Sequence, residues 1–190
     1  MRARLARAAF EIIAERGISS LRTAAVVERI GVSQGALLHH FATKEDLTLA
    51  AIEYALSKEE ARSLKAATDE IPLERGAMLT ALIEDFRAFF FHDCFWATLD
   101  ATMDSGRDKA LQMRVTAAVA HYRAPIYAQW TEHLRCVGFS PSESQEIVTM
   151  TAALVSGFAM RSLWQDISAT FAHSMATWST MIDKRWPALE

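Results

Sequence analysis

Hydrophobic positions recur along this chain every three to four residues, which is the spacing of an amphipathic helix. The first such stretch begins near Arg2, and its apolar positions follow the i, i+3, i+4, i+7 and i+8 pattern. Only four prolines and seven glycines interrupt the chain, and no alternating run is flanked by hairpin dipeptides. The sequence therefore predicts an all-α protein. The apolar positions of the first helix are Leu5, Ala8, Ala9, Ile12 and Ile13.

Capping residues and helix breakers divide this pattern into about nine helices. Ser19 and Ser20 are expected to cap the second helix, Ser33 the third, Thr43 a long fourth helix, and Ser140 the helix that begins at Pro141. Pro125 lies inside an expected helix, where it predicts a kink or a break. The expected helices are 2–15, a short one ending at Gly31, 33–41, 44–64, 72–92 begun by Pro72, 95–103 ended by a breaker at 104–106, 109–136, 141–163 begun by Pro141, and 167–184.

The second and third expected helices are joined by only Gly31 and Val32. Two short helices with so tight a turn form a helix-turn-helix, whose second helix enters the major groove of DNA. The first residues of that helix must be small or polar to reach base edges. Gln34 can hydrogen-bond an adenine, Gly35 allows close approach of the backbone, and Ala36 can contact a thymine methyl group. We therefore expect operator DNA as a partner.

The residues around this turn follow a longer pattern. Positions 31–47 read Gly-Val-Ser-x-Gly-x-Leu-x-x-His-Phe-x-x-Lys-Glu-x-Leu, and Gly17 lies 14 residues before Gly31. This pattern resembles the N-terminal signature of the TetR family of bacterial transcriptional regulators, and the resemblance covers about the first 50 residues. The matching positions are Gly17, Val26, Val27, Gly31, Val32, Ser33, Gly35, Leu37, His40, Phe41, Lys44, Glu45 and Leu47.

The resemblance implies a helix-turn-helix DNA-binding domain over residues 1–48 and a helical ligand-binding and dimerisation domain over residues 49–190. It implies a ligand-responsive regulator, most often a repressor, that binds a pseudo-palindromic operator as a homodimer and is released by a small molecule. The alternative is a protein of the same fold that acts as an interaction adaptor without sequence-specific DNA binding. The expected DNA contacts are Arg22, Thr23, Ser33, Gln34, Gly35, Ala36, Leu38, His39, His40 and Lys44.

Two positions depart from the family pattern. Leu38 replaces the usual Tyr of the recognition helix, and Leu21 replaces the usual Thr at the start of the second helix. The resemblance implies that a hydroxyl at each of these positions contacts the DNA backbone, and both changes remove that hydroxyl. Ser20, Arg22 or Thr23 could supply the contact from the second helix instead. These departures are the features that favour the adaptor alternative.

Charge is distributed unequally along the chain, whose net charge is −3. Residues 1–42 hold six Arg and three Glu, whereas the remaining residues are acidic overall. A basic segment of this kind is consistent with a DNA-facing surface. The resemblance also implies a basic arm before the first helix, and Arg2 and Arg4 are the residues that could take its place. Two alternatives stay open, in which His40 only packs between helices and Lys44 is only a solvated charge.

Aromatic residues are concentrated at positions 86–96, where six of eleven residues are aromatic. Large Met and aromatic side chains line apolar ligand pockets, although they also fill ordinary helical cores. The resemblance implies a small apolar effector, aromatic or acyl-bearing, between the helices at 72–92, 95–103 and 109–136. His121 or Arg87 would orient it. The expected ligand residues are Phe86, Phe90, Trp96, Met113, His121, Tyr122 and Trp130.

The last two expected helices each carry an apolar stripe that a single chain would not readily cover. We therefore expect them to form a four-helix bundle with the same helices of a second copy. The stripes are Val148, Ala152, Val155, Ala159 and Leu163 on one helix, and Phe171, Met175, Trp178, Met181 and Ile182 on the other.

Other classes of function find little support in the sequence. It contains no nucleophile elbow, phosphate-binding Gly-rich loop, dinucleotide fingerprint or metalloprotease helix, so we expect neither an enzyme nor a cofactor. Cys94 and Cys136 are expected to be buried thiols. No secretory pattern or apolar run long enough to span a membrane is present, which predicts a cytoplasmic protein without a membrane partner.

Overall fold

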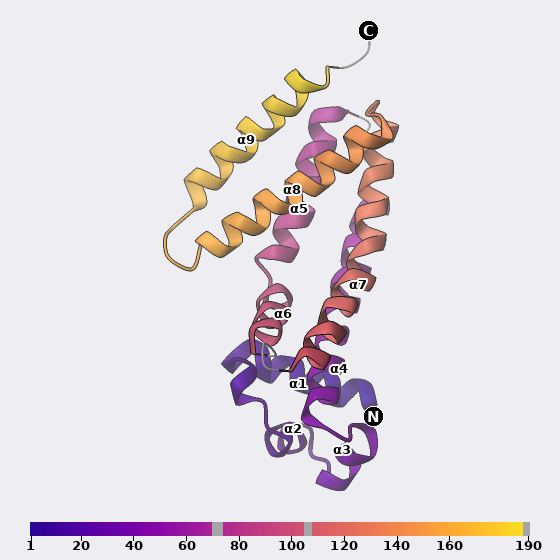
Figure 1. Cartoon of the computed structure of the whole chain (residues 1–190), viewed down its shortest axis with the longest axis vertical. Coiled ribbons are helices and arrows are strands. Elements are labelled where there is room, and N and C mark those ends of the chain that lie inside the picture. Colours follow the sequence, from indigo (N-terminus) through magenta and orange to yellow (C-terminus); the bar gives the residue numbers. More distant parts are fainter. Residues whose placement is uncertain (70–73, 105–107, 188–190) are drawn as a thin grey trace. The chain divides into compact units, whose positions relative to one another are not determined.

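The computed structural model describes residues 1–69, 74–104 and 108–187, and all regular secondary structure in these ranges is helical (Figure 1). The all-α prediction is confirmed. The helices are α1 (Arg2–Arg16), the 3₁₀ helix η1 (Ile18–Ser20), α2 (Thr23–Ile30), α3 (Gln34–His40), α4 (Lys44–Asp69), α5 (Arg75–Phe90), α6 (Asp93–Asp104), α7 (Lys109–Cys136), α8 (Pro141–Arg161) and α9 (Ser168–Arg185).

Most helix ends agree with those expected from the sequence, but α4 continues five residues further, to Asp69. Helix α7 runs on through Pro125, so the expected break does not form. A proline removes only one intrahelical hydrogen bond, and the turns on either side keep theirs. Pro72, expected to begin α5, lies outside the described residues, as do Ser105 and Gly106 of the expected breaker.

Three of the predicted N-terminal caps are confirmed. The Ser33 hydroxyl accepts a hydrogen bond from the Ala36 N–H (3.2 Å), and the Thr43 hydroxyl accepts one from Asp46 (3.0 Å). Ser140 forms a reciprocal capping box with Glu143. The hydrogen bonds from the Ser140 backbone and side chain lower the pKa of Glu143.

The expected cap at Ser19 and Ser20 is wrong. Both residues lie in η1, and the Ser20 hydroxyl donates to the Arg16 carbonyl at the end of α1 (2.8 Å). Helix α2 begins only at Thr23 and has no side-chain cap. The chain turns at Gly17, whose φ of 76° is in the region that favours glycine. After this turn the chain forms η1, so α2 begins later in the sequence than a cap at Ser19 or Ser20 would place it.

The chain forms two compact units. The first unit holds Met1–Ala61 and His92–Arg123, and the second holds Arg62–Phe91 and Ala124–Glu190. The division into functional domains at residue 48 stays a prediction, because these units are defined by compactness. Core residues of the first unit include Leu5, Ile12, Leu21, Val26, Leu37, Phe41, Leu47 and Val115, and those of the second include Met78, Leu82, Phe86, Ile126, Leu134, Ile147, Val155 and Ile182.

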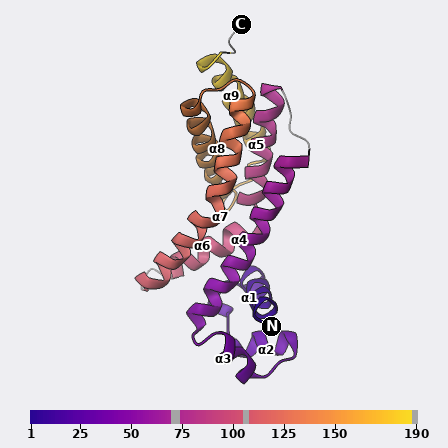
Figure 2. The same cartoon turned by 90° about the vertical axis from the view of Figure 1, so that its right-hand side faces the viewer.

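In the second unit α5 packs along α8 and contacts α9 (Figure 2). The Trp178 indole N–H donates to the Thr151 hydroxyl (2.9 Å), and the Phe158 and Phe171 rings meet edge to face at 5.5 Å. Eight of the ten residues in the predicted apolar stripes are therefore buried within one chain. The expectation that a single chain leaves the stripes uncovered is wrong, because α5, α8 and α9 pack together within the chain. Only Leu163 and Met181 are exposed.

Candidate DNA-binding surface

Helices α1, α2 and α3 enclose a small apolar core. We call residues 1–48, which hold these helices and the start of α4, the head. Helix α1 packs against η1 and α2, and α2 packs against α3. Leu37 of α3 is fully buried, as are Leu5, Leu21 and Val26 around it. Because Leu37 fixes the inward face of α3, the opposite face of this helix is presented to solvent.

The outward face of α3 carries the residues expected to meet DNA bases. Gln34, Gly35, Leu38 and His39 are exposed, and Ala36 is half-buried. A hydrogen bond between two helices positions the first of these. The Gln34 amide nitrogen donates to the Thr23 hydroxyl at the start of α2 (2.8 Å).

Gln34 therefore keeps its amide oxygen and one N–H for a further partner.

The two ends of α3 are also fixed. Ser33 is exposed and caps the helix with its hydroxyl oxygen, while its own O–H remains a possible donor. At the other end the His39 and half-buried His40 rings contact each other edge to face, with centroids 5.3 Å apart. Lys44, half-buried, begins α4.

The first turn of α4 is tied to α7 by an ion pair. The Arg114 guanidinium lies 2.9 Å from the Asp46 carboxylate. Hydrogen bonds from Arg114 and from Thr43 lower the pKa of Asp46. The helix that carries Lys44 is thereby anchored at its N-terminal end.

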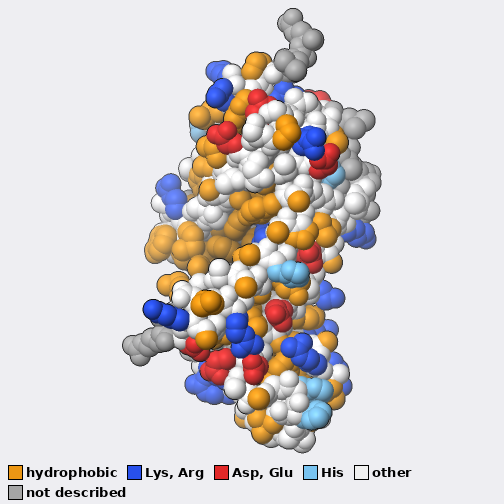
Figure 3. Space-filling model, turned by 45° about the vertical axis from the view of Figure 1, so that its right-hand side comes forward, with side chains coloured by type: hydrophobic (Ala, Val, Ile, Leu, Met, Phe, Trp, Pro, Cys, Tyr) orange, Lys and Arg blue, Asp and Glu red, His pale blue; other side chains and the backbone are white. Residues whose placement is uncertain are grey.

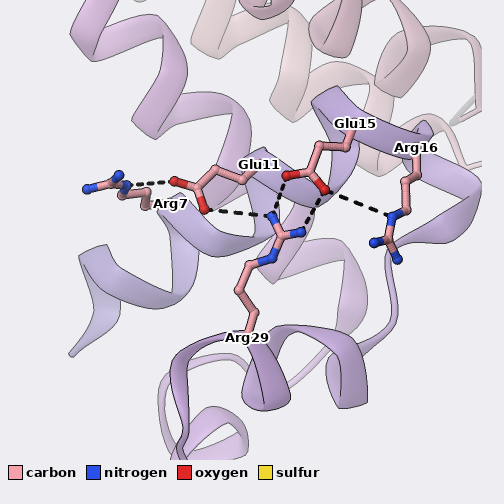
Figure 4. Close-up of polar contacts among 5 residues, drawn as sticks. All are labelled: Arg7, Glu11, Glu15, Arg16 and Arg29. Carbon is pink, nitrogen blue, oxygen red and sulfur yellow. Dashed lines mark hydrogen bonds and ion pairs between the residues drawn. The ribbon is translucent and has the colours of Figure 1, made fainter.

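Arg29 joins α2 to α1 (Figure 4). Its guanidinium donates to both carboxylate oxygens of Glu15 (2.9 and 2.6 Å) and lies 3.7 Å from Glu11. Glu11 also accepts from Arg7 (2.8 Å), and Glu15 lies 3.9 Å from Arg16. The hydrogen bond from Arg29 lowers the pKa of Glu15. Three of the arginines that make the N-terminal segment basic are therefore paired with acids.

Figure 3 shows this mixture of cationic, acidic and His side chains over the region of α1 to α3. Arg2, Arg4 and Arg22 have no carboxylate within 4 Å among the described residues. Arg2 lies over the Phe41 ring, and exposed Arg22 donates to the carbonyls of Ser19 and Leu21. These three arginines and Lys44 are the cations of the head that can still neutralise phosphate.

Helix α6 reaches the head through Asp100. Its carboxylate accepts a hydrogen bond from the Ile18 backbone N–H (2.7 Å), and α6 packs against both α1 and η1. No local pattern predicts this contact, because the two residues lie 82 positions apart. The pairs of Arg29 with Glu15 and Glu11 also join residues far apart in the sequence, whereas the Arg7–Glu11 pair has the i, i+4 spacing that can be recognised on a helix.

The first unit contains a cavity of about 250 Å³ beside α1 and α4. None of the seven expected ligand residues lines it. Its lining residues are Arg7, Phe10, Glu11, Tyr54, Ala55, Lys58, Glu59 and His92.

The expected ligand residues are divided between the two units. Phe86, Phe90 and Trp130 are buried in the second unit. In the first unit Trp96 and Tyr122 are half-buried, whereas Met113 (72% exposed) and His121 lie at the surface. Burial raises the pKa of Tyr122, and the charges of Glu53 and Glu60 add to this. Arg87, the other candidate for orienting an effector, is exposed and pairs with Glu84.

The two cysteines differ from each other. Cys94 is buried as expected, and burial raises the pKa of its thiol to about 12. Cys136 is exposed, so that half of the prediction is wrong. It is the last residue of α7, where a helix end meets solvent.

Comparison with known proteins gives a consistent result. The family described as bacterial regulatory proteins, tetR family, matches residues 5–51. The HTH-type transcriptional regulator CymR of Pseudomonas putida is 32% identical over 162 residues, which are 85% of this chain and 79% of that protein.

Solved structures of similar fold cover nearly the whole chain. A transcriptional regulator from Rhodococcus sp. Rha1 has a TM-score of 0.70 at 21% identity and covers 100% of this chain and 99% of its own. The regulator FadR from Bacillus subtilis, solved in complex with stearoyl-CoA, has a TM-score of 0.60 at 15% identity and covers 93% of this chain and 96% of its own.

Within the described ranges no helix is both long and apolar enough to cross a membrane. The matched N-terminal segment contains the helix-turn-helix formed by α2 and α3. The similarity to CymR extends well beyond this segment. This chain therefore belongs to the TetR family of bacterial transcriptional regulators.

Proposed function

We propose that this regulator is a repressor that binds a pseudo-palindromic operator as a homodimer and is released by an apolar small molecule. Because its target is DNA, we place its action in the cytoplasm. The observation that carries the proposal is the outward face of α3, which lies opposite fully buried Leu37 and carries exposed Gln34 and His39. A surface of this kind fits the major groove, where small and polar side chains meet base edges.

Base-edge and backbone contacts have separate roles in this proposal. Gln34, Ala36 and His39 are the candidates for reading bases. Lys44 is the clearest candidate for a phosphate, because it stands at the start of α4 and no carboxylate among the described residues pairs with it. The other candidates for contacts with the DNA backbone are Arg22, Thr23, Ser33 and His40. Gly35 would allow the α3 backbone to approach the DNA closely.

A salt titration of operator binding tests the role of Lys44. Lys44→Ala should weaken binding to every DNA sequence and reduce the salt dependence by about one counterion per subunit, since a phosphate contact carries no sequence information. The control is Lys65→Ala, an exposed lysine further along the same helix. A loss of sequence preference with an unchanged salt slope would refute the assignment. No sequence-specific binding by the wild type would favour the adaptor alternative.

We propose that the homodimer forms through the outward faces of α8 and α9. Met150 (41% exposed), Leu154 (36%) and Met181 (56%) are the apolar residues left open there. Small residues beside them favour close approach of helices from a second copy, and a Cβ on Gly157 would meet nothing within 4 Å. On α8 these small residues are Ala153 and Gly157, both exposed, and α9 carries exposed Ala172 and Ala176 on a flank away from Met181.

Sedimentation of variants tests this interface. Leu154→Glu should shift the protein from dimer to monomer at micromolar concentration, because it places a charge in an apolar contact. Thr80→Glu, an exposed change on α5, is the control and should leave the mass unchanged. A wild-type monomer at that concentration would contradict the proposal.

We propose that the effector binds beside the aromatic cluster of the second unit. The Phe86 ring lies 5.4 Å from Tyr127 and 6.3 Å from Phe90, and Trp130 is buried in the same unit. Aromatic walls of this kind suit apolar ligands. The fold neighbour FadR was solved with an acyl ligand, which supports this class of molecule.

The roles of the other four expected ligand residues stay predictions. Exposure of Met113 and His121 argues against these two, whereas half-buried Trp96 and Tyr122 are compatible with a ligand contact. Release from DNA requires an effector that binds two conformations unequally. Helix α4 and the Asp100 hydrogen bond to Ile18 are the connections through which such a change could reach the head.

Thermal-shift screening with aromatic and acyl compounds, followed by operator titration, tests the effector. A typical coupling of about 1 to 3 kcal/mol would lower operator affinity by roughly 5- to 150-fold. Compounds that stabilise the protein but leave operator affinity unchanged would contradict the inducer role.

A further inference from the structure

Leu38 is an exception among the leucines of the head. Leu5, Leu21, Leu37 and Leu47 are all fully buried, whereas Leu38 exposes 52% of its surface. It lies within α3, directly after the buried Leu37, so its exposure follows from the helix geometry and not from fraying of a helix terminus. A large apolar side chain on the outward face of a recognition helix needs an apolar partner to be buried on binding.

The surroundings of Leu38 leave it accessible. Gly35 precedes it by one turn and has no side chain, and a Cβ there would meet only the Ser33 hydroxyl at 3.9 Å. Gln34, on the preceding turn, is drawn toward α2 by its hydrogen bond to Thr23. Exposed His39 follows. On the outward face of α3, the Leu38 side chain therefore lies one turn after Gly35, where no side chain covers the backbone.

Only one apolar group is available in the major groove. Guanine, adenine and cytosine present hydrogen-bond donors and acceptors there, whereas thymine also presents its C5 methyl group. A leucine cannot hydrogen-bond a phosphate or a base edge, so it cannot replace the hydroxyl contact that a tyrosine would make at this position.

We infer that Leu38 reads the methyl group of one thymine in each operator half-site, and so acts as a specificity-determining residue. This inference rests on the proposed binding of operator DNA. Gly35 allows the helix backbone to approach, and the methyl group is then buried against the Leu38 side chain. Ala36, half-buried on the other side of Leu37, remains a separate candidate for a methyl contact.

Replacement of thymine by deoxyuridine tests the inference, because it removes only the methyl group. The operator is first obtained by selecting random DNA with the full-length protein, and each thymine is then replaced singly. Wild-type affinity should fall about fourfold at one position of a half-site, the factor expected for one buried methyl group, and about 15-fold when both half-sites are changed. With Leu38→Ala the same replacement should change the affinity less than about 1.5-fold, since no side chain remains to bury the methyl.

Two controls make the result specific. Leu163→Ala removes a leucine of similar exposure (57%) outside the head and should retain the full sensitivity to deoxyuridine. Thermal melting of Leu38→Ala should match the wild type, because the side chain is not part of the core.

The possible failures are distinguishable. Wild-type protein that binds a selected operator but is indifferent to every deoxyuridine overturns the role of Leu38 alone. Sensitivity that persists in Leu38→Ala assigns the methyl contact to another residue and also overturns it. If selection yields no preferred sequence, the operator proposal itself fails, and the inference about Leu38 fails with it.

Discussion

The head and the second unit use charged side chains in opposite ways. In the head, Arg29 binds Glu15 and Glu11 at the surface, where all three groups are partly open to water. In the second unit, the side chain of Asp85 is only 3% exposed. It accepts hydrogen bonds from Ser63 (2.6 Å) and from the Trp130 indole (2.8 Å).

This difference predicts different responses to mutation and solution conditions. Surface ion pairs contribute little to stability and weaken with salt, whereas loss of one partner from a buried charged cluster is costly. We therefore expect polar changes in the head to affect its geometry more than its stability. In both regions the apolar core contributes most of the stability.

The largest expected effect is the removal of the buried carboxylate. Asp85→Ala leaves the Ser63 hydroxyl and the Trp130 N–H without their acceptor, and it removes the carboxylate that lies 3.1 Å from the Arg62 guanidinium. It should lower the free energy of unfolding by about 4 kcal/mol. Urea denaturation followed by circular dichroism measures this. Asp85→Asn should lose less because it keeps an oxygen acceptor, and a neutral effect of Asp85→Ala would contradict the argument.

Exposed Glu84, the residue before Asp85, provides the matched control. Its side chain is 57% exposed and pairs only at the surface with Arg87. Glu84→Ala should change the free energy of unfolding by less than about 0.5 kcal/mol.

The next effect separates the two faces of α3. Leu37→Ala should lower stability by about 3 kcal/mol, because it leaves a cavity in the small core of the head. Leu38→Ala should stay within about 0.5 kcal/mol, because that side chain is exposed. The same urea titration measures both variants, and equal losses would contradict the orientation of α3 described above.

A smaller effect is expected from the capping box of α8. Ser140→Ala removes the acceptor of the Glu143 N–H and should cost about 1 kcal/mol. Ser142→Ala is the control and should cost less, because the Ser142 hydroxyl hydrogen-bonds to the Ser140 hydroxyl (3.3 Å) but does not accept the Glu143 N–H. Differential scanning calorimetry compares the two variants, and identical melting temperatures would contradict the assignment of Ser140 as the cap of α8.

The smallest effect concerns the ion pair of the head. Arg29 lowers the pKa of Glu15 from its ordinary value of 4.5, so ionised Glu15 stabilises the folded state above about pH 4.5. This contribution is lost as the pH falls through the lowered pKa of the folded state. Glu15→Gln should melt slightly below the wild type near neutral pH, and the difference should vanish in acid and shrink in high salt. Glu28→Gln, an exposed acid on α2, is the control; a difference that grows in acid would contradict the sign.

The helices and the DNA-reading motif were predictable because their signals are local. Ser33 and Thr43 cap helices whose first turns lie within three residues, and Gly31 adopts the left-handed conformation (φ 67°, ψ 44°) that ends α2. The exposed positions of the α3 surface also followed from its periodicity around Leu37. The 3₁₀ turn at Ile18–Ser20 was missed, because two adjacent serines gave a plausible cap at the wrong place.

The sequence by itself determined the order of the helices, the family and the residues that α3 presents. Only the tertiary structure decided that Asp100 holds Ile18, that Arg114 anchors Asp46, and that most of the residues in the stripes of α8 and α9 are buried within one chain. Helix formation and capping depend on residues within about one turn. Contacts between residues 82 or 68 positions apart depend on how whole helices pack, which local spacing does not specify.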